Sequence, residues 1–406
     1  MSAAIEPPPQ VNDDALARRN AIVLSLTQAL AGANSTVSVA TGGIVGAMLA
    51  PERSLATLPV TAYVLGMWCG TIPMGWLARR LGRRAAFQIG TISGVLTGIV
   101  CCLGVLQGSF WLFCAGTFLS GLYASAHQGY RFAAADTASE HFRPKAISWV
   151  LLGGVAAGIF GPQLIIATKD IWPPYLFAAT YLFQSAIAVA AACVLGFLRI
   201  PPHPAPAPGT GRGRSLYTIL RQPRFVVAVA CGIASYAMMN MVMTAAPLAM
   251  VECNHTVTQA TLGLQWHVIA MYLPSFFTGH LILRFGVSRV TALGLALILA
   301  SAVINIAGVT LWHFWTGLIL LGIGWNLGFI GATTMVTHCH RPQERHRVQS
   351  FNDFLIFGSM AVGSFSSGKL LAFAGWSVIN ELVFPFVLAA GALLAWQMLR
   401  RPRLAN

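Results

Sequence analysis

Charge is scarce in this sequence. Only 9% of the 406 residues are charged, and eleven are acidic, whereas a soluble domain carries roughly 25% charged residues. Paired carboxylates for acid–base catalysis are therefore hard to assemble. The phosphate-loop pattern GxxxxGK[ST], the zinc-protease pattern HExxH and the nucleophile-elbow pattern GxSxG are absent, and so is any CxxC pair. We therefore expect that the protein is not an enzyme.

Long apolar runs take the place of charge. Hydrophobic residues make up 56% of the chain, and uninterrupted stretches recur that reach the roughly 20 residues a transmembrane helix needs. We expect an all-α membrane protein with twelve transmembrane helices. The expected spans are 20–48, 54–77, 85–106, 109–136, 145–168, 174–198, 223–250, 260–284, 288–310, 313–337, 347–373 and 376–399.

Basic residues predict the orientation. Lys and Arg outnumber Asp and Glu by 25 to 11. With both termini cytoplasmic, only Arg53 and Lys169 would fall in outer loops, which satisfies the positive-inside rule. We expect a multi-pass protein of the cytoplasmic (inner) membrane, with the lipid bilayer as a partner. Nucleic acid is not an expected partner, because the arginines are dispersed over separate loops. The first residues lack the features of a signal peptide.

A Pro/Gly/Arg-rich stretch divides the expected helices into six and six. Residues 199–222 should form a cytoplasmic central loop, with one six-helix bundle over 20–198 and another over 223–399. Residues 1–19 and 400–406 should be cytoplasmic tails. Two halves of equal orientation suggest a parallel repeat about an axis along the membrane normal.

The loop after the second expected span carries a repeated pattern. Its glycines and arginines are Gly75, Arg79, Arg80, Gly82, Arg83 and Arg84, and the second half has Gly279, Arg284, Gly286 and Arg289 at the matching place. The first set resembles the signature Gly-x-x-x-Asp-Arg-x-Gly-Arg-(Arg/Lys) of the major facilitator superfamily. The resemblance implies a carrier with two six-helix bundles and a gating loop. Arg79 stands where the family has an Asp that is implicated in a charge relay.

Methionine and histidine stand out in two apolar spans. Met239 and Met243 are four residues apart, as are His267 and Met271. Residues four apart share one face of a helix. Thioether and imidazole ligands would suit a soft ion such as Cu(I), while a methionine stripe is also common as adaptable core packing.

The same four residues resemble the marks of the CcoA-type copper importers, a branch of the superfamily. That branch has Met-x-x-x-Met on its seventh helix and His-x-x-x-Met on its eighth. The resemblance implies import of copper, as Cu(I), across the cytoplasmic membrane by alternating access, in supply of cbb3-type cytochrome oxidase assembly. Copper would be the substrate, with no resident cofactor, and a copper chaperone or oxidase assembly factors would act downstream. The implied ligands are Met239, Met243, His267 and Met271.

Further residues are candidates for the transport path. Cys231, Cys253 and Met250 flank the methionine pair and could relay a metal, although cysteine in an apolar helix is often a small hydrophobe. In this fold the first, fourth, seventh and tenth helices usually line the cavity. Their polar residues are then expected to line it here: Asn34, His127, Gln128, Tyr236, Asn240, Trp325 and Asn326.

Two alternatives to copper import stay open. One is a proton-coupled carrier of a small organic or cationic compound, in which the methionines form an adaptable apolar lining. The other is a copper receptor or assembly factor that does not transport. Flux measurements would separate them.

Overall fold

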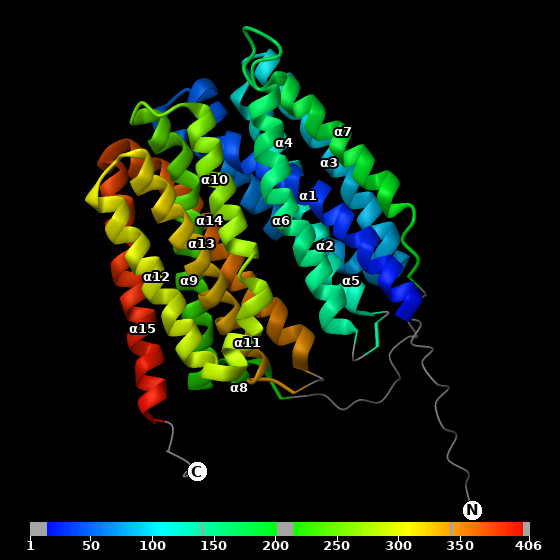
Figure 1. Cartoon of the computed structure of the whole chain (residues 1–406), viewed down its shortest axis with the longest axis vertical. Coiled ribbons are helices and arrows are strands. Elements are labelled where there is room, and N and C mark those ends of the chain that lie inside the picture. Colours follow the sequence, from blue (N-terminus) through cyan, green and yellow to red (C-terminus); the bar gives the residue numbers. More distant parts are fainter. Residues whose placement is uncertain (1–13, 137, 140–141, 201–213, 342–343, 401–406) are drawn as a thin grey trace, which may run out of the picture.

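Helices make up the fold throughout the described part of the chain. The computed structural model describes residues 14–136, 138–139, 142–200, 214–341 and 344–400. Figure 1 shows two groups of helices side by side, built from the two halves of the sequence. The first group is α1 (Asp14–Leu49), the short η1 (Arg53–Leu55), α2 (Leu58–Leu81), α3 (Arg83–Leu106), α4 (Phe110–His127), α5 (Tyr130–Asp136), α6 (Arg143–Thr168) and α7 (Ala178–Leu195). The second is α8 (Leu216–Leu220), α9 (Pro223–Glu252), α10 (Val257–Tyr272), α11 (Ser275–Phe285), α12 (Val287–Ala307), α13 (Leu311–Thr337), α14 (Arg345–Glu381) and α15 (Val383–Arg400).

Broken helices explain how the expected spans map onto these elements. In the described residues, nine helical stretches are long and apolar enough to cross a membrane, or ten when α10 and α11, bent by 43°, are taken as one. The expected span 109–136 is divided between α4 and α5. Residues 347–400 count as one stretch, yet Gly375 leaves the helical conformation inside it (φ 80°, ψ −178°). That glycine lies where the last two expected spans were divided.

Proline accounts for the bend between α10 and α11. Pro274 follows the end of α10 and has no N–H to donate to the carbonyl of Ala270. The helix therefore ends at Tyr272 and restarts at Ser275. The consequence is a joint between α10 and α11, next to residues that line the central cavity.

The two halves repeat one backbone feature closely. Gly82 joins α2 to α3 with φ 84° and ψ 158°, and Gly286 joins α11 to α12 with φ 85° and ψ 148°. Residues that carry a Cβ rarely adopt this positive-φ backbone conformation, so both turns favour glycine. The matching glycine loops seen in the sequence therefore form the same tight turn.

The halves are closed against each other at one end. We call the end at which α1 begins and α15 ends the terminal face, and the other end the opposite face (Figure 1). Toward the opposite face, Arg53 forms an ion pair with Glu252 (2.6 Å) and Thr61 donates to Ser364 (3.2 Å). In the described chain, the hydrogen bonds between the halves gather at this face.

Candidate functional site

A cavity of about 110 Å³ lies between the two halves. Helices α1, α2, α4 and α6 line it from the first half, and α9, α10 and α14 from the second. None of the described residues that line it is Asp, Glu, Lys or Arg. A cavity without charge is suited to a neutral ligand, because an ion moved out of water needs a counter-charge or ligating groups.

The wall formed by the first half is polar. Its hydrogen-bonding side chains are Gln28, Ser35 and Thr36 on α1, Tyr63 on α2, and His127 with Gln128 at the end of α4. His127 is only 6% exposed, and its Nε2 lies 3.1 Å from the Ser35 hydroxyl. Its Nδ1 has no hydrogen-bond partner. A buried nitrogen left without a partner costs free energy, so a ligand group that reached it would gain a hydrogen bond.

The wall formed by the second half is soft and aromatic. Met239 and Met243 on α9 and Met271 on α10 line it, together with the rings of Tyr236 and Tyr272. A second layer of rings supports the first. The Tyr236 ring centroid lies 5.1 Å from that of Trp325 and 4.8 Å from that of Phe329. Thioethers adapt to the outline of an apolar ligand, and flat rings accept another ring at these spacings.

The predicted copper quartet is not assembled around the cavity. Its three methionines line the cavity, but His267 does not. The His267 side chain is fully buried, and its Nδ1–H donates to the carbonyl oxygen of Leu318 on α13 at 2.7 Å. Gly322 allows α13 to approach α10 closely here, since a Cβ at that position would lie 2.6 Å from the His267 carbonyl oxygen. His267 therefore links two helices of one half.

The predicted metal relay is also absent from the described cavity lining. The Cys231 thiol faces α15, with its sulfur 3.9 Å from the Ala390 carbonyl oxygen. Met250 is fully buried in the core of the second half, and Cys253 lies at the end of α9. In the described residues, no group of three or more His, Cys, Asp or Glu side chains could hold a metal ion.

The candidate lining residues divide into two groups. His127, Gln128, Tyr236 and Asn240 lie on the cavity. Asn34 does not, because it faces α7 and accepts a hydrogen bond from Gln184 at 2.9 Å. Trp325 and Asn326 were also expected on the cavity but lie elsewhere.

Trp325 and Asn326 support the cavity from behind. The Trp325 ring forms the second layer under Tyr236. Asn326 holds the joint between α10 and α11: its amide donates to the Met271 carbonyl and to the Ser275 hydroxyl, both at 2.6 Å. It also accepts from Thr278 at 2.6 Å. Asn326 thus satisfies a carbonyl that the helix break leaves open.

Sequence reasoning missed the contributions of α2, α6 and α14 to the lining, and that of Tyr272 on α10. Tyr63, Tyr272 and Met360 lie on the cavity, but their helices are outside the set expected to line it. Tyrosine within an otherwise apolar span was a usable signal, because a buried hydroxyl usually finds a polar partner.

The expected gating loop is fastened to its surroundings. The Arg80 guanidinium lies 4.5 Å from the Trp76 ring centroid, and Arg84 donates to the Gly196 carbonyl at the end of α7 (2.8 Å). The Arg79 side chain folds back toward Gly75, and Arg83 opens α3 after the turn at Gly82. Four arginines thus crowd one turn at the terminal face.

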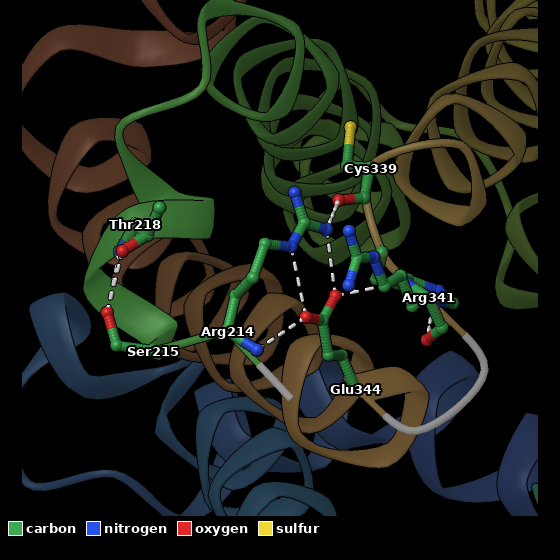
Figure 2. A network of polar contacts seen from close by, with 7 residues as sticks. Arg214, Ser215, Thr218, Cys339, Arg341 and Glu344 are labelled. Carbon is green, nitrogen blue, oxygen red and sulfur yellow. Dashed lines mark hydrogen bonds and ion pairs between the residues drawn. The ribbon is translucent and has the colours of Figure 1, made fainter. Parts of the chain in front are cut away.

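A second polar cluster at the terminal face surrounds Arg214, just before α8 (Figure 2). The Glu344 carboxylate, 3% exposed, accepts from the Arg214 guanidinium (2.8 and 3.0 Å) and from its backbone N–H (2.7 Å). It also accepts from the backbone N–H of Arg341 (2.9 Å). Arg214 further donates to the Cys339 carbonyl (3.1 Å). The guanidinium lowers the pKa of Glu344 to about 2, so the pair stays charged in the cell.

Comparison with known proteins identifies the class of transporter. The Major Facilitator Superfamily model matches residues 24–235 and 228–406. The riboflavin transporter RfnT of Brucella anthropi is 48% identical over 93% of this chain and 95% of its own length. The uncharacterized MFS-type transporter YddS of Bacillus subtilis is 26% identical over 88% of this chain and 86% of its own.

A solved structure has the same fold. The nucleoside transporter NupG, crystallised as a point mutant, superposes with a TM-score of 0.69 over 95% of this chain and 99% of its own, at 14% identity. That likeness shows the fold alone. It confirms the predicted all-α, multi-span architecture.

These findings overturn the prediction of copper import. A relative that is nearly half identical over almost the whole chain is a riboflavin transporter. The copper-importer branch, copper as partner and the downstream copper proteins are therefore wrong. The prediction of a multi-pass transporter rather than an enzyme is confirmed, because the chain belongs to the major facilitator superfamily.

Proposed function

We propose that this protein carries riboflavin across the membrane by alternating access. Riboflavin is neutral at physiological pH and has two unlike parts, a flat three-ring flavin and a flexible ribityl chain rich in hydroxyls. The observation that carries the proposal is the cavity, which is uncharged and has one polar wall and one wall of thioethers and aromatic rings. The 48% identity with RfnT supports the same substrate.

The lining also favours a neutral cargo over a cation. A cation held in a cavity of low polarity needs a carboxylate to offset the loss of its hydration. The described lining offers none. Of the alternatives that the sequence left open, transport of a small organic compound is therefore favoured in its neutral form.

The volume of the cavity describes the state of the carrier. Small-molecule sites usually have roughly 300–1,000 Å³, so about 110 Å³ is too little for a three-ring ligand. The halves must therefore part before riboflavin can load. Since the hydrogen bonds between the halves gather at the opposite face in the described chain, we assign this conformation to the state that opens toward the terminal face.

We place the terminal face in the cytoplasm. The basic residues of the loops are concentrated there, as the positive-inside rule requires of a protein in the cytoplasmic membrane. Both termini are then cytoplasmic, and the structure corresponds to an inward-facing state after closure of the outer side. Residues 20–198 and 223–399 would move as two bundles joined by 199–222. The arginine-rich α2–α3 loop would restrain that movement at the cytoplasmic side.

Riboflavin uptake in cells tests the proposal. The full-length protein is expressed in a riboflavin-auxotrophic bacterium that lacks its own riboflavin carrier, and growth on low riboflavin is compared with uptake of the radiolabelled vitamin. We expect growth and saturable uptake, with unchanged cellular copper. Failure of both, with the protein present in the membrane, would refute the proposal.

A further inference from the structure

We propose that His127, with the polar side chains beside it on α1 and α4, binds the ribityl chain of riboflavin. The flavin ring then lies against the wall formed by α9 and α10. This inference rests on the proposed function and deepens it, because it assigns the two ends of the substrate to the two halves of the carrier.

The first step is the free nitrogen of His127. Its side chain is only 6% exposed and lines the cavity, with Nε2 next to the Ser35 hydroxyl at 3.1 Å and Nδ1 without a partner. A neutral imidazole has one donor nitrogen and one acceptor nitrogen. Whichever role Ser35 leaves to Nδ1, a hydroxyl group can match it, since a hydroxyl both donates and accepts. A chain of hydroxyls is therefore a suitable partner.

The second step is the uneven distribution of polar groups. The second half contributes the carboxamide of Asn240 to the described lining, and this amide already donates to the Met360 carbonyl (3.2 Å). The carboxamides of Gln28 and Gln128 lie on the same side of the cavity as His127 and Ser35. Each carboxamide offers donors and an acceptor. Several groups that can both donate and accept, gathered on one wall, match the several hydroxyls of a ribityl chain better than the few heteroatoms on the edge of a flat ring.

The third step is the opposite wall. A flavin ring needs two broad apolar faces to cover it, and such surface is concentrated in the second half, where Met239, Met243 and Met271 lie beside Tyr236. Tyr236 is itself supported by the rings of Trp325 and Phe329. A platform held from behind loses little freedom when a ring packs on it. The two walls thus suit the two ends of one neutral molecule.

The test compares two flavins that differ only in the chain. Lumiflavin carries the same ring system as riboflavin with a methyl group in place of ribityl. Each is used to inhibit uptake of labelled riboflavin by cells that express His127→Leu, His127→Gln or the unchanged protein. We expect His127→Leu to weaken inhibition by riboflavin by about 5- to 100-fold, the effect of one buried hydrogen-bonding group. Lumiflavin inhibition should not change, and His127→Gln should retain most of the riboflavin affinity.

Met243→Ala is the matched variant from the other wall. It should weaken inhibition by riboflavin and inhibition by lumiflavin to the same extent. An equal loss for riboflavin and lumiflavin in His127→Leu, or no loss for either, would overturn the inference. Gln128→Leu gives the same comparison if His127→Leu does not reach the membrane. If the unchanged protein takes up no riboflavin, the proposed function itself fails, and that outcome is distinct from a failure of this inference.

Discussion

Replacing Gly368 with alanine should hold the carrier open at its opposite face. Gly368 lies on α14 where this helix meets the start of α2 in the other half. A Cβ at this position would lie 2.2 Å from the Thr57 hydroxyl oxygen and 3.3 Å from the Ser54 carbonyl oxygen. Since 2.2 Å is far inside van der Waals contact, the Thr57 hydroxyl must turn away and lose its hydrogen bond to the Ser364 carbonyl, or the two halves must move apart. Either change weakens the closed contact between the halves. The clash exists only when this face is closed.

The size of the effect follows from the cost of overpacking. Inserting a methyl group into a filled space costs about 1–3 kcal/mol. About 1.4 kcal/mol is a factor of ten in an equilibrium constant. The ratio of molecules closed at the opposite face to molecules open there should therefore fall by roughly 5- to 150-fold. Thr61 lies next to this contact, is only 3% exposed and donates to Ser364 of the other half. Its exposure to solvent therefore measures the opening. A cysteine introduced at Thr61, in a variant without the native cysteines, should react faster with a membrane-impermeant maleimide.

Gly358→Ala is the matched control. Gly358 lies on the same helix, and a Cβ there would meet no atom within 4 Å. When Gly358→Ala carries the same cysteine in place of Thr61, that cysteine should react with the maleimide as fast as it does in the protein with both glycines. Equal labelling of Gly368→Ala and Gly358→Ala, with both proteins intact by gel filtration, would refute the packing argument.

Three further predictions concern stability. His267→Ala leaves the Leu318 carbonyl without its donor at 2.7 Å and should lower the free energy of unfolding by about 1–3 kcal/mol; a melting temperature in detergent that rises with Cu(I) in the unchanged protein but not in the variant would contradict this structural role. Asn326→Leu removes three hydrogen bonds of 2.6 Å at the joint of α10 and α11, so it should lower the melting temperature and slow uptake, and an unchanged melting curve would argue against the joint. Glu344→Gln should lower the melting temperature by an offset that stays constant from about pH 5 to pH 8, because Arg214 lowers the pKa of Glu344 from 4.5 to about 2, and a group with a lowered pKa loses its stabilising effect only as the pH falls between those values. An offset that vanishes near neutral pH would contradict the assignment.

The helices could be predicted from the sequence because the membrane imposes one strong rule. Every backbone group in the bilayer must be paired within the chain, so an apolar run of sufficient length becomes a helix. The tight turns at Gly82 and Gly286 could also be anticipated from the two matching loops. What could not be anticipated was the break at Pro274, since a proline in a membrane helix is often tolerated when neighbours satisfy the freed carbonyl. Here Asn326, from a distant part of the sequence, donates to the Met271 carbonyl, which neighbours the Ala270 carbonyl that the proline frees.

The surroundings of the His267 side chain could not be predicted from its spacing in the sequence. His267 lies four residues from Met271, so sequence spacing placed both on one face. The structure turns Met271 to the cavity and His267 to Leu318, which is 51 residues away along the chain. That outcome depends on the close approach of α13, which Gly322 permits. Contacts between segments so far apart leave no trace in local spacing.

Riboflavin exchange by the purified protein tests the central claim most directly. The full chain is reconstituted in liposomes loaded with unlabelled riboflavin, and radiolabelled riboflavin is added outside. A neutral flavin carrier should accumulate the label transiently, with saturation, with competition by excess riboflavin and without effect of copper or a copper chelator. Absence of riboflavin exchange by protein that is folded and inserted, or flux of copper in its place, would contradict the account.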